Sequence, residues 1–236
     1  MAKVSFSRYN DGYCQLYIYT SMPDAHFISF EGIDGVGKTT QARLLQAYLE
    51  KKGIKVHWTR EPGGTPVGEK LRAIVLNDDM MDDTELMLFF AARVEHIERV
   101  IKPMLAQGIW VISDRFSDAT YAYQVGGKGL DIKRVEEIER VAIQGYQPHR
   151  TYYLDLTHEQ SQERMLVRAR AQGLSAEEAM HDRFESLGHD FFKRVREAYI
   201  NRYETHPQRI LKIDANVSIE AIHETIIKDL EEKGWL

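Results

Sequence analysis

Cysteine is nearly absent from this sequence, which holds only Cys14 among its 236 residues. A single thiol excludes an internal disulfide framework and any metal site built from several cysteines. Long apolar runs are also lacking, so no stretch approaches the roughly 20 residues of a membrane-spanning helix. The first residues lack the long apolar core of a signal peptide, because Arg8 and Asp11 interrupt them. We therefore expect a cytoplasmic protein with no membrane partner.

An excess of positive charge is lacking as well. The chain has 31 Lys and Arg residues against 36 Asp and Glu residues, for a formal net charge of −5. This balance argues against non-specific binding of nucleic acid, so no nucleic-acid partner is expected. Hydrophobic residues make up 43% and charged residues 28%, which is ordinary for a soluble globular protein. The length is sufficient for one α/β domain.

The most informative stretch is a glycine-rich motif near the start of the chain. It reads Gly32-Ile33-Asp34-Gly35-Val36-Gly37-Lys38-Thr39 and fits G-x-x-x-x-G-K-[ST], the phosphate-binding P-loop. An apolar strand is expected before it, over residues 26–30, and an amphipathic helix after it, over residues 41–52. Lys38 would then reach the β- and γ-phosphates of ATP, and the Thr39 hydroxyl would bind Mg²⁺. Together with Thr40, the eight motif residues form the predicted ATP site.

The rest of the chain alternates between predicted strands and helices. Strands are expected over residues 55–59, 109–113, 151–156 and 209–213, and helices over 67–76, 82–107, 131–144, 189–205 and from 218 onward. Thr157 to Gln160 has the form of a capping box and opens another helix. The alternation predicts an α/β fold, a P-loop three-layer sandwich in which helices flank a five-stranded parallel sheet.

Two segments stand apart from this alternation. Residues 1–25 form a predicted N-terminal extension, in which β-forming stretches flank the turn signal Asn10-Asp11-Gly12 of a possible hairpin. Residues 26–236 form the predicted P-loop domain. Within it, a charged stretch broken by Gly173 and Gly188 indicates a short flap or lid at about residues 170–188.

Polar residues at the end of the predicted strand 109–113 indicate the chemistry. Asp114 occupies the place of the second acidic residue of a P-loop site and would bind Mg²⁺, whereas the alternative is an ordinary surface aspartate. Arg115 follows directly, and an arginine there suits a second phosphate-bearing substrate. The chain has no Asn-Lys-x-Asp motif for guanine and no Asp-Glu pair at this strand end, which argues against a GTPase and an ATP-hydrolysing motor.

Five motifs together resemble those of thymidylate kinases, from Phe27 to about Leu230. They are Phe30 to Thr40, Thr59-Arg60-Glu61-Pro62-Gly63-Gly64-Thr65, Leu88-Phe89-Phe90-Ala91-Ala92-Arg93, Asp114-Arg115-Phe116 and Ala122-Tyr123-Gln124. The resemblance implies transfer of the γ-phosphoryl group of ATP to dTMP, with Mg²⁺ as cofactor. It also implies a homodimer. The apolar helix 86–105 is a candidate interface, or it belongs to the core.

The resemblance also implies a set of substrate-binding residues. Phe89 would stack on thymine, and Arg93, one helical turn later, would donate to a thymine carbonyl. The alternatives are core packing for Phe89 and a solvated charge for Arg93. The full set comprises Glu61, Pro62 in a cis peptide, Arg72 and Arg115 on the dTMP phosphate, Phe89, Arg93, Thr120 near the sugar or base, Tyr123 under the sugar and Gln124 on the base edge. Tyr123 could instead only pack, and Arg72 could be a surface charge.

The position after Asp34 bears on catalysis. Some thymidylate kinases carry an arginine there to neutralise transition-state charge, but this chain has Gly35. Arginines near the predicted lid would then supply the charge, namely Arg168 and Arg170, with Arg164 and Arg183 also available. At least one of these could simply be a solvated helix charge. The predicted catalytic set is Lys38, Asp34, Arg115, Arg168 and Arg170, although Asp34 could be only a turn residue.

Two other classes of function remain open from the sequence. One is a kinase of the same fold that acts on another pyrimidine nucleotide or nucleoside. A nucleoside kinase would need a carboxylate base near a sugar hydroxyl rather than several arginines near a phosphate. The other is a nucleotide-dependent binding protein without catalytic activity, which would have no need of lid arginines.

Overall fold

A five-stranded parallel sheet forms the centre of the protein, for which the computed structural model describes residues 3–5, 17–19, 25–171, 173 and 187–236. The strand order is β4-β5-β3-β6-β7, and every neighbouring pair is parallel. The strands are β3 (Phe27–Glu31), β4 (Val56–Arg60), β5 (Trp110–Asp114), β6 (Arg150–Asp155) and β7 (Ile210–Asp214). Each of the five predicted strands is present, within one or two residues at its ends.

Burial explains why these segments form strands. All residues of β3 and β6 are buried, and so are the first four of β5. Central strands of a parallel sheet are covered on both faces, and near-continuous apolar runs are typical of them. Phe30 and Tyr152 lie side by side in the core, at a ring-centroid distance of 5.4 Å. The sheet therefore forms a rigid base whose carboxyl ends lie along one edge.

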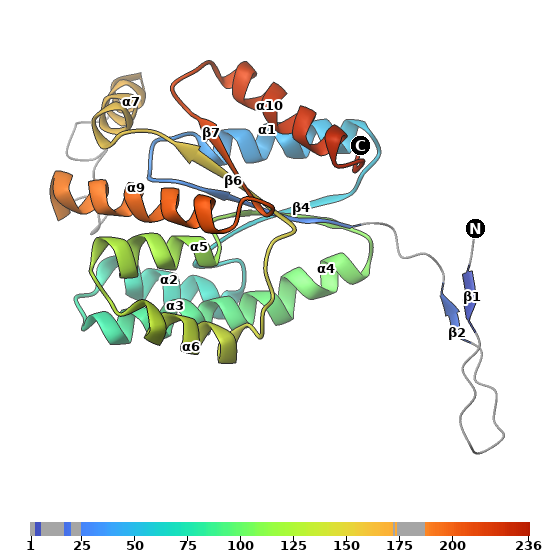
Figure 1. The fold of residues 1–236 in the computed structure, drawn as a ribbon, viewed down its shortest axis with the longest axis horizontal. Coiled ribbons are helices and arrows are strands. Elements are labelled where there is room, and N and C mark those ends of the chain that lie inside the picture. The colour runs from blue at the N-terminus through green and yellow to red at the C-terminus, as the bar shows by residue number, and fades with distance from the viewer. Residues whose placement is uncertain (1–2, 6–16, 20–24, 172, 174–186) are drawn as a thin grey trace.

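Helices cover both faces of the sheet (Figure 1). On one face lie α1 (Lys38–Lys51) and α10 (Ile219–Glu232). The other face carries α2 (Pro66–Asn77), α3 (Asp82–His96), α4 (Lys102–Ala106), α5 (Ser117–Thr120), α6 (Ile132–Ala142) and α9 (Gly188–Thr205), while α7 (His158–Ala171) lies at the carboxyl edge. The three-layer α/β fold predicted from the sequence is confirmed.

Two helical regions differ from the prediction. The helix expected over residues 82–107 contains a π-helical segment, η1 (Ile97–Ile101), between α3 and α4. The N-cap of α3 is Met81, which makes no side-chain cap, and Asp82 and Asp83 lie in the first turn of that helix. A second π-helical segment, η2 (Tyr121–Gly127), continues α5, and no helix was predicted there. A π-turn spaces its inward-facing residues differently from an α-helix. The sequence of η2 therefore shows little α-helical periodicity.

Side chains cap the starts of other helices, one of them at the predicted capping box. Thr157 Oγ1 accepts from the Gln160 backbone N–H, and Gln160 Oε1 accepts from that of Thr157, which is a reciprocal capping box. Asp131 caps α6 and Ser218 caps α10. These caps fix where the helices begin after the loops at the sheet edge.

The N-terminal segment forms a separate pair of short strands. β1 (Lys3–Ser5) pairs antiparallel with β2 (Tyr17–Tyr19), while the predicted turn at Asn10 to Gly12 lies outside the described residues. The same holds for most of the predicted lid, since residues 172 and 174–186 are not described.

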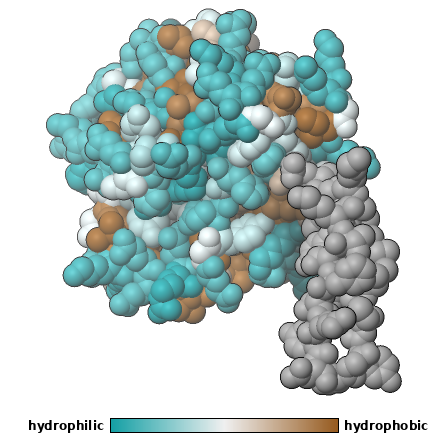
Figure 2. All heavy atoms as spheres, turned by 45° about the vertical axis from the view of Figure 1, so that its right-hand side comes forward, coloured by the Kyte–Doolittle hydropathy of each residue, from teal (hydrophilic) through white to brown (hydrophobic). Residues whose placement is uncertain are grey.

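The surface of the α/β domain is largely polar. Figure 2 shows hydrophilic residues over most of one face, with apolar side chains in small scattered spots. Exposed apolar residues occur on several elements, for example Met81 and Val141. Within the part of the chain that the structure describes, no helix is long and apolar enough to cross a membrane.

Candidate functional site

The P-loop connects β3 to α1 and wraps around the side chain of Lys38. Lys38 Nζ donates to the carbonyl oxygens of Gly32 at 3.0 Å and Ile33 at 2.8 Å, and lies 3.3 Å from Asp34 Oδ1. Burial and the nearby Arg115 charge lower the pKa of Lys38. Gly32, Gly35 and Gly37 all have positive φ, a conformation that glycine adopts without steric cost. A glycine-rich loop that leads into a helix N-terminus in this way can present backbone N–H groups to a bound anion.

Helix α7 packs directly against the P-loop at Gly35. A Cβ atom built there would lie 2.8 Å from Met165 Cγ and 2.9 Å from the carbonyl oxygen of Ser161. The Ser161 hydroxyl also donates to the Asp34 carbonyl oxygen. A larger side chain at position 35 therefore has no space while α7 occupies this place.

Thr39 and Asp114 meet where the start of α1 faces the end of β5. The Thr39 hydroxyl donates to Asp114 Oδ2 at 2.6 Å. Both atoms are hard oxygen donors, the type that Mg²⁺ prefers, and two protein oxygens are a common share when substrate phosphates and water complete the shell. The donor set therefore fits a magnesium ion.

Arg115 extends from the end of β5 across the P-loop. Its φ of 73° is unusual for a residue other than glycine. The guanidinium donates to the Gly32 carbonyl at 3.0 Å and to Asp34 Oδ1 at 2.9 Å. It also donates to the Tyr199 hydroxyl at 3.2 Å and the Tyr123 hydroxyl at 3.1 Å. Burial opposes charge on both groups. The charges of Arg115 and Lys38 nevertheless hold the pKa of Asp34 well below its usual range, and Tyr123 and Asp34 raise the pKa of Arg115.

Two clefts meet at this arginine. The aromatic cleft, of about 610 Å³, contains all nine predicted substrate-binding residues together with Asp34, Leu76, Phe116 and Ala119. The P-loop cleft, of about 1980 Å³, contains residues 34–41, Asp114, Arg164, Arg168 and the start of α10. Asp34, Glu61, Arg72 and Arg115 line both clefts. A group bound in one cleft would therefore contact a group bound in the other.

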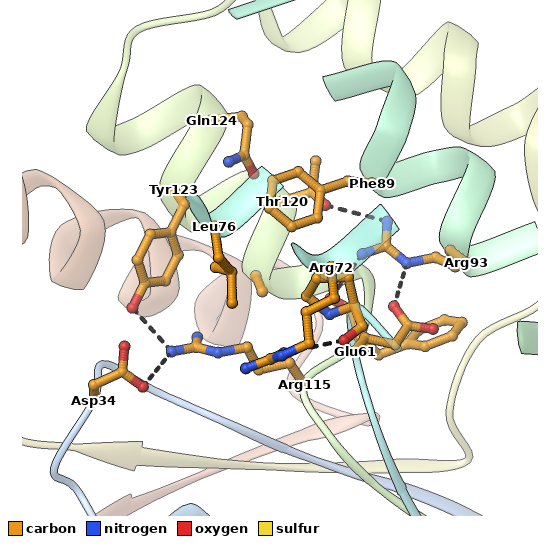
Figure 3. A pocket seen from close by; sticks show the side chains of 13 residues that line it. Asp34, Glu61, Arg72, Leu76, Phe89, Arg93, Arg115, Thr120, Tyr123 and Gln124 are labelled. Atoms are coloured by element: carbon orange, nitrogen blue, oxygen red, sulfur yellow. Dashed lines mark hydrogen bonds and ion pairs between the residues drawn. The ribbon is translucent and has the colours of Figure 1, made fainter. Parts of the chain in front are cut away.

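The aromatic cleft has two chemically different ends (Figure 3). Phe89, Arg93 and Gln124 lie at one end, while Arg72, Arg115 and Asp34 lie at the other. The first end offers a ring face with a few polar groups, and the second offers two cations. Such a cleft suits a molecule with a flat ring at one end and an anion at the other.

The Arg93 side chain is held from several sides. Nε donates to Glu61 Oε2 at 2.7 Å, and the two terminal nitrogens donate to Thr120 Oγ1 at 3.1 Å and the Phe116 carbonyl at 3.3 Å. Only 2% of Arg93 is exposed, so it is not the solvated helix charge considered from sequence. Burial alone would raise the pKa of Glu61, but Arg93 and His96 lower it.

His96 completes this buried network. Its Nδ1 lies 2.9 Å from Glu61 Oε1, and its Nε2 lies 2.7 Å from Thr59 Oγ1. A Cβ atom at Gly64 would lie 2.8 Å from His96 Nε2, so the glycine turn packs directly on this imidazole. The Glu61–Pro62 peptide is cis, as the resemblance implied, and Arg72 donates to the Pro62 carbonyl at 3.0 Å.

The arginines of α7 do not share one environment. Arg168 and Arg170 are both exposed, but only Arg168 lines the P-loop cleft. Arg164 also lines the cleft and donates to the Ala215 carbonyl at 2.5 Å. Arg183 lies outside the described residues.

A buried acidic group lies beneath Arg115. Glu31 Oε1 accepts from the Phe116 backbone N–H at 2.7 Å, and Oε2 accepts from the Tyr199 hydroxyl at 2.9 Å. Burial, together with the nearby charge of Asp118, raises the pKa of Glu31 to about 8. Asp118 forms ion pairs with Arg202 and Arg209. These contacts hold the backbone at Phe116 and Asp118, directly after Arg115, and so help to orient the Arg115 side chain.

Several buried polar residues of the site were not predicted. They are Glu31, Glu85, His96 and Tyr199, none of which is more than 1% exposed. Glu85, Phe89 and Arg93 are spaced by four residues and His96 by three more, so all four lie near one helix face. Their helical spacing from Phe89 and Arg93, both predicted site residues, was a usable signal for Glu85 and His96. No local pattern distinguishes Glu31 or Tyr199.

Comparison with known proteins identifies relatives along nearly the whole chain. A model of the thymidylate kinase family matches residues 30–226. Thymidylate kinase from Nitrosospira multiformis is 46% identical over 206 residues, which cover 86% of this chain and 96% of that protein. The enzyme of the same name from Ralstonia nicotianae is 46% identical over 210 residues, covering 87% and 96%. The crystal structure of thymidylate kinase from Ehrlichia chaffeensis superposes with a TM-score of 0.69 at 32% identity, covering 89% of this chain and 99% of that one.

Proposed function

Because the chain belongs to the thymidylate kinase family, we propose that its two clefts bind dTMP and ATP and that Arg115 aligns the two at their junction. The reaction is the ATP-dependent phosphorylation of dTMP to dTDP. The observation that carries the assignment of sites is that Asp34, Glu61, Arg72 and Arg115 line both clefts. Phosphoryl transfer needs acceptor and donor to meet in line, and these residues surround the place where they would meet.

In this arrangement the thymine ring lies against Phe89, with Arg93 and Gln124 on its edge. Tyr123 lies beneath the sugar, and Thr120 lies beside the sugar or base. The dTMP phosphate then reaches Arg72 and Arg115 at the other end of the aromatic cleft. The separation of ring-binding and anion-binding groups in Figure 3 supports this orientation over the reverse.

ATP occupies the P-loop cleft, with its phosphates on the backbone N–H groups of the P-loop and on Lys38. The Gly32 and Ile33 carbonyls hold Lys38 over the loop, so its ammonium is already placed where negative charge develops. Arg115 bridges the acceptor phosphate and the P-loop. Positioning and charge neutralisation then supply most of the rate enhancement.

The transfer needs no strong general base. A phosphate monoester has a second pKa of about 6, so its attacking oxygen is mostly deprotonated at neutral pH. Asp34 remains charged beside Arg115 and keeps that guanidinium oriented. Arg168, and in second place Arg170, supply positive charge from α7 for the transition state. Arg168 is favoured because it lines the cleft.

Use of ATP by this family implies a divalent metal ion. We propose Mg²⁺, held by the Thr39 hydroxyl and, directly or through water, by Asp114. When bound, it would shield the charge of the ATP phosphates. The 2.6 Å contact between Thr39 Oγ1 and Asp114 Oδ2 supports this pairing, because it shows that both oxygens reach one point.

The proposal is tested by the choice of acceptor. Coupled ADP release should be fastest with dTMP when dTMP, dUMP, dCMP, dGMP and AMP are compared at equal concentrations. Thymidine without its phosphate serves as the matched control, since it offers no phosphate to Arg72 and Arg115. Preference for another nucleotide would contradict the placement of the base, and efficient transfer to thymidine would indicate a nucleoside kinase. ADP release that no acceptor stimulates would indicate a nucleotide-dependent binding protein.

We propose further that the protein is a cytoplasmic homodimer. Leu86, Phe90, Ile97 and Ile101 of the helix considered as an interface are buried within the chain. They therefore belong to the core, and a dimer would use the opposite side of this helix, where Met87 is exposed. Light scattering after size exclusion gives the mass directly, and a monomer at micromolar concentration would contradict the proposal.

A further inference from the structure

Glu85 is a fully buried carboxylate that touches a base-edge residue of the aromatic cleft. It lies on α3, one turn before Phe89, and its exposure is 0%. Oε1 accepts from Gln124 Nε2 at 3.0 Å, and Oε2 accepts from Lys128 Nζ at 2.7 Å. Lys128 also binds the exposed Asp82 at 2.7 Å. The carboxylate thus connects a cation on one side with the Gln124 carboxamide on the other.

This contact decides which end of the Gln124 carboxamide faces the cleft. An ionised carboxylate only accepts hydrogen bonds, whereas a carboxamide has a donating NH₂ and an accepting oxygen. The NH₂ group must therefore face Glu85, because the hydrogen-bond partners of a carboxamide determine its orientation. The oxygen is left to face the cleft, and Figure 3 shows it on the side of Phe89 and Thr120. Only 2% of Gln124 is exposed, so bulk water does not stabilise the flipped amide.

Arg93 supplies the opposite polarity across the same ring site. A guanidinium has five N–H donors and no acceptor. Three contacts of Arg93, to Glu61, Thr120 and the Phe116 carbonyl, fix its plane. Its remaining N–H groups can only donate. The ring site thus presents a fixed donor at Arg93 and a fixed acceptor at Gln124.

We propose that Glu85 is a specificity-determining positioning residue, which fixes Gln124 so that the cleft selects pyrimidines carrying N3–H beside O4. Thymine and uracil present this acceptor–donor pair. Cytosine presents the reverse, because its exocyclic N4 amino group donates and its N3 accepts. Cytosine would place donor against donor at Arg93 and acceptor against acceptor at Gln124. The inference rests on the proposed placement of the base in the aromatic cleft.

The size of the effect follows from the cost of mismatched polar groups. A good bidentate pair discriminates by about 1–3 kcal/mol, which is roughly 5- to 150-fold. In Glu85→Gln, residue 85 can present either an oxygen or an NH₂ group, so Gln124 is free to turn its own NH₂ toward the cleft. The preference for dTMP over dCMP, measured as the ratio of kcat/KM values, should fall by about tenfold or more. The preference for dTMP over dUMP should not change, since both bases carry N3–H.

The experiment compares dTMP, dUMP and dCMP as acceptors for the wild-type protein, Glu85→Gln and Asp82→Asn. Asp82→Asn is the matched control, because Asp82 also binds Lys128 whereas Gln124 donates to Glu85. It should keep the wild-type dTMP-to-dCMP ratio. Glu85→Asp provides a second test if Glu85→Gln does not fold. It keeps the charge for Lys128 but withdraws the carboxylate by one methylene, and its dTMP-to-dCMP ratio should also fall.

Equal losses with all three acceptors would overturn the inference, because a merely structural role lowers every rate alike. An unchanged dTMP-to-dCMP ratio in both Glu85 variants would overturn it too. These outcomes differ from failure of the proposed function, which would appear as a wild-type protein that does not prefer dTMP. A selective fall in the dTMP-to-dCMP ratio, with Asp82→Asn unaffected, would support the inference.

Discussion

The guanidinium of Arg115 lies 2.9 Å from the carboxylate of Asp34, and both side chains line both clefts. The ion pair joins the end of β5 to the P-loop. Arg115 also donates to the Gly32 carbonyl at 3.0 Å, so one planar group is held to two points of the loop. This geometry fixes an arginine at the junction where acceptor and donor phosphates would meet.

Substitution of Arg115 by lysine should lower kcat by about 100-fold or more, which corresponds to roughly 2.7 kcal/mol of lost charge stabilisation. Lysine keeps the charge but cannot contact the Gly32 carbonyl, Asp34 and Tyr123 in one plane. Steady-state kinetics with ATP and dTMP measure the effect. Arg134→Lys, on an exposed ion pair with Asp83 outside both clefts, is the matched control and should remain within about threefold. Comparable activity in the two variants would contradict the role of Arg115.

The two arginines of α7 should differ in their effect on turnover. Arg168→Ala is expected to account for most of the loss seen in the Arg168→Ala/Arg170→Ala double variant, because Arg168 lines the P-loop cleft. Arginines that stabilise transferring phosphoryl groups contribute about 10³-fold or more. The dTMP KM should change little, since neither residue lines the aromatic cleft. A larger loss in Arg170→Ala than in Arg168→Ala would transfer the role to Arg170.

Gly35→Ala should destabilise the protein by about 1–3 kcal/mol, from positive φ and overpacking together. The added Cβ would lie within 2.9 Å of Ser161 and Met165, so either the P-loop or α7 must shift. Urea unfolding at constant pH gives the free energy of unfolding. Gly53→Ala is the control, because Gly53 also has positive φ but no atom within 4 Å of the added Cβ. Equal destabilisation in the two variants would show that packing of α7 on Gly35 contributes nothing.

The fold and the main site motifs were predictable because they depend on local patterns. The P-loop is contiguous, the strands are nearly continuous apolar runs, and Phe89 and Arg93 are related by one helical turn. Placing Asp114 and Arg115 beside the P-loop needed only the rule that carboxyl ends of parallel strands share one edge. The comparisons confirm the family that these motifs indicated.

The buried polar residues behind the site could not be predicted in the same way. Glu31 meets Tyr199 across 168 residues of sequence, and no local rule predicts so distant a pair. Glu85 and His96 sit on a predictable helix, but their partners Gln124 and Thr59 come from other elements. The π-helical turn that carries Gln124 was also missed, since its spacing departs from 3.6 residues per turn. Such contacts become visible only when the tertiary structure brings the elements together.

Glu31 should make stability depend on pH in the direction opposite to that of an ordinary carboxylate. Burial raises its pKa from 4.5 to about 8, so between these values the folded state binds more protons than the unfolded state. The contribution is fully present below pH 4.5 and is lost as pH rises through about 8. Burial opposes charge on Asp118, but Arg209 and Arg202 lower its pKa to about 2. Asp118 therefore stays charged in this window.

Glu31→Gln removes this titration while keeping an oxygen that accepts from the Phe116 backbone N–H. The variant should gain stability relative to the wild type as pH rises from 5 to 8, by at most about 1.4 kcal/mol for each pH unit. Urea unfolding at several pH values measures the difference, in which the contributions of the histidines cancel because both proteins contain them. A difference that stays constant, or that falls with rising pH, would mean that Glu31 is charged in the folded protein. Arg115 would then lie above a buried anion rather than a neutral carboxyl group.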